Sequence, residues 1–95
     1  MKIVKFENKN CPKCMQAKML LDNTGNSDIV ESVMPYFEEQ GAILAGKLKQ
    51  PLTAFPTFVV FDGEDNEVEG KRMDSYDPSR AEELLALVEY VKKKK

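Results

Sequence analysis

Residues 2–21 read KIVKFENKNCPKCMQAKMLL, and they place two cysteines between an apolar segment and a run of helix-forming residues. The segment Lys2–Phe6 is short and rich in β-branched and aromatic side chains, which predicts a buried first strand. Pro12 suits the first position of a helix, where no N–H partner is needed, so we expect a helix to begin just after Cys11. Turn-forming residues at 22–26 should end that helix. The stretch therefore predicts a strand, a polar loop and a helix, with the cysteine pair at the start of the helix.

The middle of the chain predicts a second strand and a second helix. Ser27–Val33 has an apolar pattern that suits a strand, and the helix should span about Pro35–Lys49, because proline favours a helix start. Gly41 weakens this helix by about 1 kcal/mol relative to alanine, so two shorter pieces are an alternative. We expect three of its apolar side chains to face the core, namely Phe37, Leu44 and Leu48.

The last third of the chain predicts a hairpin and a final helix. Thr57–Phe61 is the clearest strand in the sequence, and the turn residues after it lead to a short, polar edge strand at Glu67–Glu69. Asp77, followed by proline, should cap the last helix. Apolar residues recur in that helix at three- and four-residue spacing: Leu84, Leu85, Val88 and Val91. The element order is therefore β-α-β-α-β-β-α, an α/β chain with a four-stranded mixed sheet flanked by helices.

The composition excludes several classes of protein. The 95 residues are fewer than the roughly 150 that serve as a prior for one domain, so we expect a single domain over residues 1–95. A net charge of −2 gives no general attraction for nucleic acid. No apolar run approaches the ~20 residues of a membrane span, and lysines interrupt Met1–Lys5 too early for a signal peptide. We therefore expect a cytoplasmic protein without nucleic-acid or membrane partners. The absence of histidine removes the commonest metal ligand and general base.

The two cysteines, three residues apart at a helix start, are the sharpest chemical feature. The sulfur of Cys11 at the N-cap can accept hydrogen bonds from the N–H groups of Lys13 or Cys14, and the positive end of the helix dipole favours a thiolate. Lys13 and Lys9 add positive charge, and each effect lowers a thiol pKa from its usual value of about 8.5. A thiolate on Cys11 can attack a disulfide, and Cys14 is placed to resolve the mixed disulfide. We predict that Cys11 and Cys14 are catalytic and that Lys13 tunes the site electrostatically.

Two other interpretations of the cysteine pair stay open. A Cys-x-x-Cys motif can be half of a zinc site, but the chain has no second pair and no histidine, so carboxylates or a second chain would have to complete it. A zinc ion or an iron–sulfur cluster held between two chains would make the protein a binding module instead of an enzyme. The pair could also be two buried structural thiols. The strand–cysteine–helix context favours the redox interpretation, with no metal site.

Two segments of the chain resemble a known family. Residues 11–21 resemble the active-site helix of glutaredoxins, Cys-Pro-Tyr-Cys-x-x-Ala-Lys-x-Leu-Leu, and residues 54–61 are similar to the cis-proline loop and following strand that glutaredoxins share with thioredoxins. The resemblance implies the thioredoxin fold and a dithiol–disulfide oxidoreductase of glutaredoxin-like type. It also implies a cis peptide at Phe55–Pro56, packed against the cysteines. Phe55, Pro56 and Thr57, together with Lys13, would then bind substrate, and Phe55 would offer its backbone N–H and C=O to an extended chain.

The chain departs from both families at several positions. Lys5 stands where thioredoxins have a buried aspartate, which leaves water or a carboxylate such as Glu7 to deprotonate the second cysteine. Lys13 stands where glutaredoxins have tyrosine. The Gly-Gly-x-Asp turn with which glutaredoxins bind glutathione is absent before the last helix. At that place Lys71 and Arg72 would either pair with glutathione carboxylates or lie in a solvated turn.

The resemblance also implies the partners of the protein. Its substrates would be proteins with disulfides, or mixed disulfides with glutathione. Recycling would come from glutathione, as the glutaredoxin-like interpretation implies, or from a flavoprotein thioredoxin reductase, as in a thioredoxin-like electron donor. We expect a monomer with no bound cofactor. Among the methionines, we expect Met19 in the core and Met15 and Met73 at the rim around Cys11.

Overall fold

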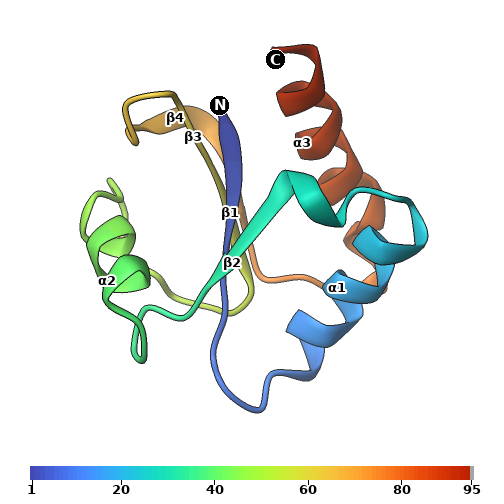
Figure 1. Ribbon diagram of the computed structural model, residues 1–95. Coiled ribbons are helices and arrows are strands. Elements are labelled where there is room, and N and C mark those ends of the chain that lie inside the picture. The colour runs from blue at the N-terminus through green and yellow to red at the C-terminus, as the bar shows by residue number, and fades with distance from the viewer. Residues whose placement is uncertain (95) are drawn as a thin grey trace.

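The computed structural model describes residues 1–94, so Lys95, the last residue of the predicted domain, lies outside the described part. Four strands form one sheet in the order β2-β1-β3-β4 (Figure 1). Strand β1 is parallel to β2 and antiparallel to β3, and β3 is antiparallel to β4. The predicted element order and the mixed four-stranded sheet are confirmed. The helices and strands are β1 (Lys2–Phe6), α1 (Pro12–Asn23), β2 (Val30–Val33), α2 (Glu39–Gly46), β3 (Thr57–Phe61), β4 (Glu67–Asp74) and α3 (Ala81–Lys93).

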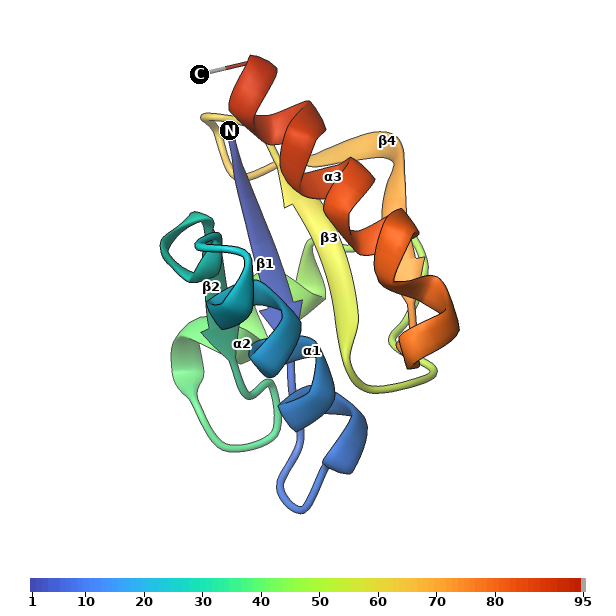
Figure 2. The ribbon, with the colours of Figure 1, turned by 90° about the vertical axis from the view of Figure 1, so that its right-hand side faces the viewer.

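The two central strands, β1 and β3, are covered on both faces of the sheet. Every residue of β3 is buried, which explains its uninterrupted apolar sequence. Because side chains alternate along a strand, Ile3 and Val60 belong to one core cluster with residues of α1 and α3, whereas Val4 and Val59 belong to another with Leu44 of α2. Figure 2 shows α1 and α3 in front of the sheet and α2 behind it. A residue of β1 at an odd position therefore faces α1.

The two ends of the sheet differ in what they carry. Strand β1 begins and α3 ends at one end, and the loop between β1 and α1 lies at the opposite end (Figures 1 and 2). This loop leads into the cysteine pair, so the pair lies at the end of the sheet remote from the start of β1. Among residues 1–94, no helix has the length and apolar character that a membrane span requires.

The segment between α1 and β3 differs from its prediction. The expected strand Ser27–Val33 is shorter, because Ser27–Ile29 forms a turn of 3₁₀-helix and only β2 is a strand. The expected helix Pro35–Lys49 is confined to α2, which has eight residues. Leu44 and Leu48 contact the core as predicted. The prediction was therefore right about the type of these elements and wrong about their length.

A tight turn before α2 explains why that helix is short. The carbonyl of Met34 accepts hydrogen bonds from the N–H groups of Phe37 at 3.1 Å and Glu38 at 2.9 Å, so the chain reverses before the helix begins. Phe37 is 53% exposed, which corrects its predicted place in the core. A Cβ on Gly41 would lie 2.9 Å from the carbonyl carbon and oxygen of Met34. The absence of a side chain at Gly41 therefore allows α2 to pack directly on this turn.

Strand β4 is longer than the predicted Glu67–Glu69 and continues to Asp74. It pairs with β3 at both ends, with Phe61 opposite Glu67 and Phe58 opposite Met73, and the register shifts between Val59 and Phe61. Lys71 and Arg72 consequently lie in a strand and not in a solvated turn. The polar composition of β4 is typical of an edge strand, which the sheet order confirms.

Two methionines occupy environments opposite to those predicted. Met19 is 59% exposed. The buried face of α1 consists of Cys14, Ala17 and Leu21, and Met19 does not lie on that face. Met73 is 3% exposed and belongs to the core cluster on the α1 and α3 face. Met15 is exposed and lines a cavity with both cysteines, as predicted. Residue type alone does not fix the face, whereas position along the helix or strand does.

Candidate active site

Cys11 and Cys14 are joined by a disulfide at the start of α1, with their Cα atoms 5.2 Å apart. Cys11 is the N-cap residue and has an extended backbone. The N–H of Cys14 donates a hydrogen bond to the sulfur of Cys11 at 3.2 Å. The predicted cap and one of its two predicted donors are therefore confirmed. Because backbone N–H groups and the helix dipole favour negative charge at this position, the site would stabilise a thiolate on Cys11 once the disulfide is reduced.

The two sulfur-bearing residues differ in their access to solvent. Cys11 is half-buried, whereas Cys14 is only 4% exposed. Cys11 lines two open cavities, one of about 410 Å³ with Phe55 and one of about 420 Å³ with Met15 and Met34. Cys14 lines only the second of these. A substrate can therefore approach Cys11 from outside, while Cys14 lies behind it.

The loop before β3 adopts the predicted conformation. The Phe55–Pro56 peptide is cis, and Pro56 is buried. Phe55 lines the cavity beside Cys11 and Lys13, and its ring makes an edge contact with Tyr36, with the ring centroids 5.7 Å apart. Of the three residues expected to bind substrate here, Phe55 is thus the one that the structure brings to the cavity.

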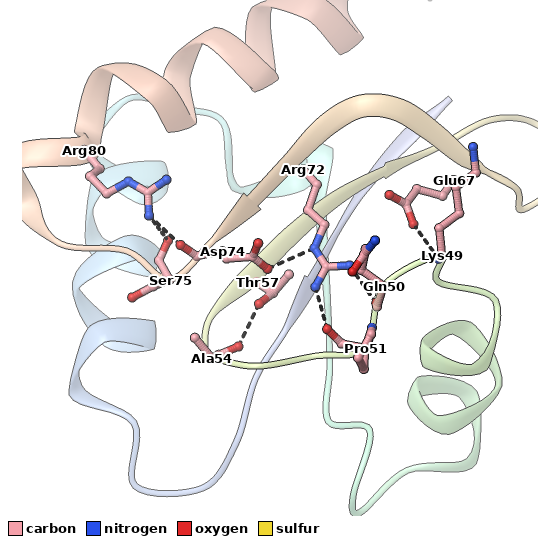
Figure 3. Close-up of polar contacts among 10 residues, drawn as sticks. All are labelled: Lys49, Gln50, Pro51, Ala54, Thr57, Glu67, Arg72, Asp74, Ser75 and Arg80. Atoms are coloured by element: carbon pink, nitrogen blue, oxygen red, sulfur yellow. Dashed lines mark hydrogen bonds and ion pairs between the residues drawn. The ribbon is translucent and has the colours of Figure 1, made fainter.

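Thr57 takes part in the loop itself. It is fully buried, and its hydroxyl donates a hydrogen bond to the carbonyl of Ala54 at 2.7 Å (Figure 3). This contact closes the turn around the cis peptide. The side chain of Thr57 therefore supports the loop from inside.

Arg72 fixes the same loop from β4, as Figure 3 shows. Its guanidinium donates hydrogen bonds to the carbonyls of Gln50 at 2.8 Å and Pro51 at 2.9 Å and to the carboxylate of Asp74 at 2.9 Å. Lys71 lies over the ring of Tyr90, with its ammonium 4.4 Å from the ring centroid. Both side chains are engaged within the chain, and the expectation that they bind glutathione carboxylates stays a prediction. The sequence did not predict the contact of Arg72 with this loop, because Gln50 and Pro51 lie 22 and 21 residues before Arg72 in the chain.

Positive charge flanks Cys11 on the surface. Lys13 is exposed and lines the cavity with Cys11. Hydrogen bonds from the hydroxyl and the N–H of Ser79, and secondarily the charge of Lys13, hold the pKa of Asp77 below its usual value. Lys9 lies over the ring of Phe37, with its ammonium 4.2 Å from the ring centroid. Both predicted lysines thus border the site.

A buried ion pair lies beneath the cysteines. Lys5 is 1% exposed, and its ammonium donates a hydrogen bond to the carbonyl of Cys14 at 3.0 Å and contacts the carboxylate of Glu7 at 2.6 Å. Glu7 also lines the second cavity together with Cys11 and Cys14. The sequence signal for this pair is the alternation along β1, because positions 3, 5 and 7 face α1. That alternation identifies the face, but it does not show which atoms of α1 the lysine reaches.

The described residues do not gather other metal ligands at the site. Over residues 1–94, no cluster of three or more histidine, cysteine, aspartate or glutamate side chains is arranged to hold a metal ion.

Comparisons with known proteins agree with this geometry. The solution structure of a thioredoxin from Thermus thermophilus is similar to the chain, with 30% sequence identity, a TM-score of 0.60, and coverage of 94% of this chain and 72% of that one. The X-ray structure of Fasciola hepatica thioredoxin matches in fold, with 20% identity, a TM-score of 0.55, and coverage of 88% and 76%. No protein-family model and no curated protein sequence matches the chain.

Both of these structural matches are thioredoxins, and the glutaredoxin-like type stays a prediction. The shared fold and the bonded pair of Cys11 and Cys14 support a thiol–disulfide oxidoreductase. The identity to the Thermus protein extends over nearly the whole chain and includes more than two thirds of that protein. The chain belongs to the thioredoxin superfamily.

Proposed function

We propose that the protein is a dithiol–disulfide oxidoreductase that reduces disulfides of other proteins, with Cys11 as the nucleophile and Cys14 as the resolving cysteine. The observation that carries this assignment is the difference in access between the two sulfurs. Cys11 borders both open cavities, whereas Cys14 is almost fully buried behind it. An incoming disulfide would therefore meet Cys11 first.

The proposed reaction transfers two electrons through one mixed disulfide. The thiolate of Cys11 attacks one sulfur of the substrate disulfide, the substrate S–S bond breaks, and the departing substrate thiolate takes up a proton. Cys14 then loses its proton and attacks the sulfur of Cys11. The second substrate thiol leaves, and the bond between Cys11 and Cys14 forms as it stands in the structure. The N–H of Cys14 supports the first step because it already points at the sulfur of Cys11.

The loop at Phe55 would hold the substrate chain beside Cys11. Phe55 lines the cavity that contains Cys11, and the internal hydrogen bonds of Thr57 and Arg72 fix the loop around it. A fixed loop can bind an extended chain through its backbone N–H and C=O groups, which is independent of the substrate sequence. Lys13 would favour acidic residues near the substrate disulfide.

For recycling we favour a flavoprotein reductase over glutathione. Arg72 and Lys71, the cations expected to bind glutathione carboxylates, are engaged with backbone carbonyls and with Tyr90. The structural relatives named above carry the name thioredoxin. The proposal also includes a monomer that works in the cytoplasm with no bound cofactor, since a reducing compartment keeps such a pair cycling between its two states.

The experiment is intact-mass measurement after equilibration in a series of reduced-to-oxidised glutathione ratios, with acid quenching. Wild-type protein should lose two hydrogen atoms at a defined midpoint, without accumulating glutathione adducts. The matched variants are Cys11→Ser and Cys14→Ser, which each remove one sulfur. Only Cys14→Ser should accumulate a stable mixed disulfide with a protein substrate, because it keeps the first step and lacks the second.

Two results would overturn parts of the proposal. A dithiol that persists across the whole series, or a bound metal that blocks oxidation, would remove the oxidoreductase assignment in favour of a binding module. Abundant glutathione adducts on Cys11 of the wild-type protein would replace the flavoprotein route by the glutaredoxin-like one.

A further inference from the structure

Lys5 is a fully buried cation directly beneath the resolving cysteine. It is 1% exposed within a strand whose neighbours Val4 and Phe6 are completely buried. Its ammonium donates to the carbonyl of Cys14 at 3.0 Å, so the charge lies against the residue whose sulfur must ionise. Burying an ammonium costs several kcal/mol unless it is paired, and a buried pair is seldom more stabilising than apolar residues of the same volume. Stability alone therefore does not account for a lysine at this position.

Glu7 supplies the counter-charge but is the more solvated partner. Its carboxylate contacts the ammonium of Lys5 at 2.6 Å, and its side chain is 19% exposed against 2% for Lys5. Water screens an exposed charge more strongly than a buried one. The ammonium is the drier of the two charges and the one in hydrogen-bond contact with the backbone of Cys14, so its field there is screened less than that of the carboxylate.

The other charged groups around Lys5 are exposed. Lys18 and Asp22 of α1 line a small cavity of about 100 Å³ with it, and they pair with each other at 2.8 Å with side chains 61% and 42% exposed. The neighbours of Lys5 across the sheet, Ser32 on β2 and Phe58 on β3, carry no charge. Lys5 is thus the buried charge closest to the backbone of Cys14 among these groups.

We propose that Lys5 is a positioning residue whose ammonium favours the thiolate of Cys14 in the resolving step. This inference rests on the proposed function, because it concerns the second half of that reaction. Burial disfavours ionisation of the Cys14 thiol, and an adjacent positive charge offsets that penalty. The proton of Cys14 passes to solvent in the cavity that both cysteines line, and the thiolate then attacks the sulfur of Cys11 and releases the substrate thiol.

The two half-reactions can be observed separately with dithiobisnitrobenzoate, an aromatic disulfide whose released thiolate is coloured. Reduced protein should release a first equivalent at a rate that depends on reagent concentration, when Cys11 attacks. The second equivalent should appear at a rate independent of reagent concentration, when Cys14 resolves the mixed disulfide. Stopped-flow absorbance therefore reports on each cysteine in one experiment.

The principal variant is the double substitution Lys5→Met/Glu7→Gln, which removes the cation without leaving an unpaired buried charge. The second phase of this variant should be about tenfold slower, because a one-unit rise in the pKa of the Cys14 thiol reduces the thiolate tenfold at a pH below that pKa. Its first phase should change by less than about twofold. The pH at which the second phase reaches half its maximum should rise. Lys2→Met, which removes a partly exposed charge at the far end of β1, is the matched control and should leave both phases unchanged.

Single variants separate the ammonium from the carboxylate. Glu7→Gln leaves the cation without a counter-charge and should keep the second phase as fast as wild type or faster. Lys5→Met leaves the carboxylate alone beside Cys14 and should give the slowest second phase, provided circular dichroism shows that it folds. The inference is overturned if the double variant resolves within twofold of wild type, or if Glu7→Gln alone slows the second phase as much as the double variant does. Wild-type protein that releases only one equivalent would remove the proposed function, and the inference with it.

Discussion

Replacing Arg72 by methionine tests whether one side chain on an edge strand holds the loop that carries Phe55. The guanidinium binds two carbonyls, those of Gln50 and Pro51, and one carboxylate, that of Asp74. The Arg72 side chain is only 11% exposed, although the groups that accept its hydrogen bonds are more accessible to water. Methionine keeps most of the apolar stem of the side chain and removes all three bonds.

The expected loss follows from the kind of bond. Hydrogen bonds to charged groups contribute about 1.5–3 kcal/mol, but Gln50 and Pro51 are exposed, so water can replace part of what their carbonyls lose. We expect Arg72→Met to lower the free energy of unfolding by about 2 kcal/mol, or Tm by about 8–16 °C for a chain of this size. Arg72→Lys should lose about half as much, because an ammonium cannot reach two carbonyls with the planar geometry of the guanidinium. Asp74→Asn should cost only about 0.2–1 kcal/mol, since the ion pair with this half-exposed carboxylate is solvated.

The assay is thermal unfolding by circular dichroism, combined with KM and kcat for a protein disulfide and for a small aromatic disulfide. The loop displacement in Arg72→Met should raise KM for the protein substrate at temperatures where the variant is folded, and leave the small disulfide unaffected. If Arg72→Met unfolds within about 2 °C of wild type, or at a temperature no lower than that of Asp74→Asn, the loop does not depend on the guanidinium. In that case the three hydrogen bonds contribute no net stability.

Two further predictions concern stability. Hydrogen bonds from two backbone N–H groups of its turn lower the pKa of Asp62, so the stability that its carboxylate contributes is present above the unfolded pKa of about 4 and is lost as pH falls through the folded pKa. When Tm is measured against pH, wild type should be more stable than Asp62→Asn at neutral pH, and the difference should close in acid. A difference that stays constant with pH would contradict this. A Cβ at position 41 would meet the Met34 backbone at 2.9 Å, whereas one at position 46 would meet nothing within 4 Å. Urea unfolding should therefore show Gly41→Ala destabilised by about 1–3 kcal/mol and Gly46→Ala unchanged or more stable by up to about 1 kcal/mol, and equal effects would refute the close-packing argument.

The sequence predicted best those features that depend on neighbouring residues. The cap at Cys11 involves atoms three residues apart, and the buried strand β3 shows itself in five consecutive residues. The boundaries of α2 could not be predicted in the same way. They depend on the turn at Met34 and on the packing of Gly41 against it, which is a contact between two elements and leaves no periodic signal.

The same distinction separates the predicted parts of the site from the missed ones. Cys11, Cys14 and the cis peptide at Phe55–Pro56 belong to short motifs, and the structure brings Cys11 and Phe55 to one cavity. The contact of Lys5 with the carbonyl of Cys14 crosses from a strand to a helix, and that of Arg72 with Pro51 crosses from a strand to a loop. The place of Lys5, where thioredoxins have a buried aspartate, indicated that this residue was unusual. Its partner could be named only when the packing of α1 on the sheet was known.

The start of β1 and the end of α3 lie at one end of the sheet, and the cysteine loop lies at the other (Figures 1 and 2). This placement has a practical consequence. An affinity tag, a fluorescent label or a solid support attached before β1 would lie at the end of the sheet opposite to the cysteine loop. The protein can therefore be immobilised through one end with its reactive sulfur directed outward. A column of this kind, prepared with the Cys14→Ser variant, would retain client proteins as mixed disulfides and release them on reduction.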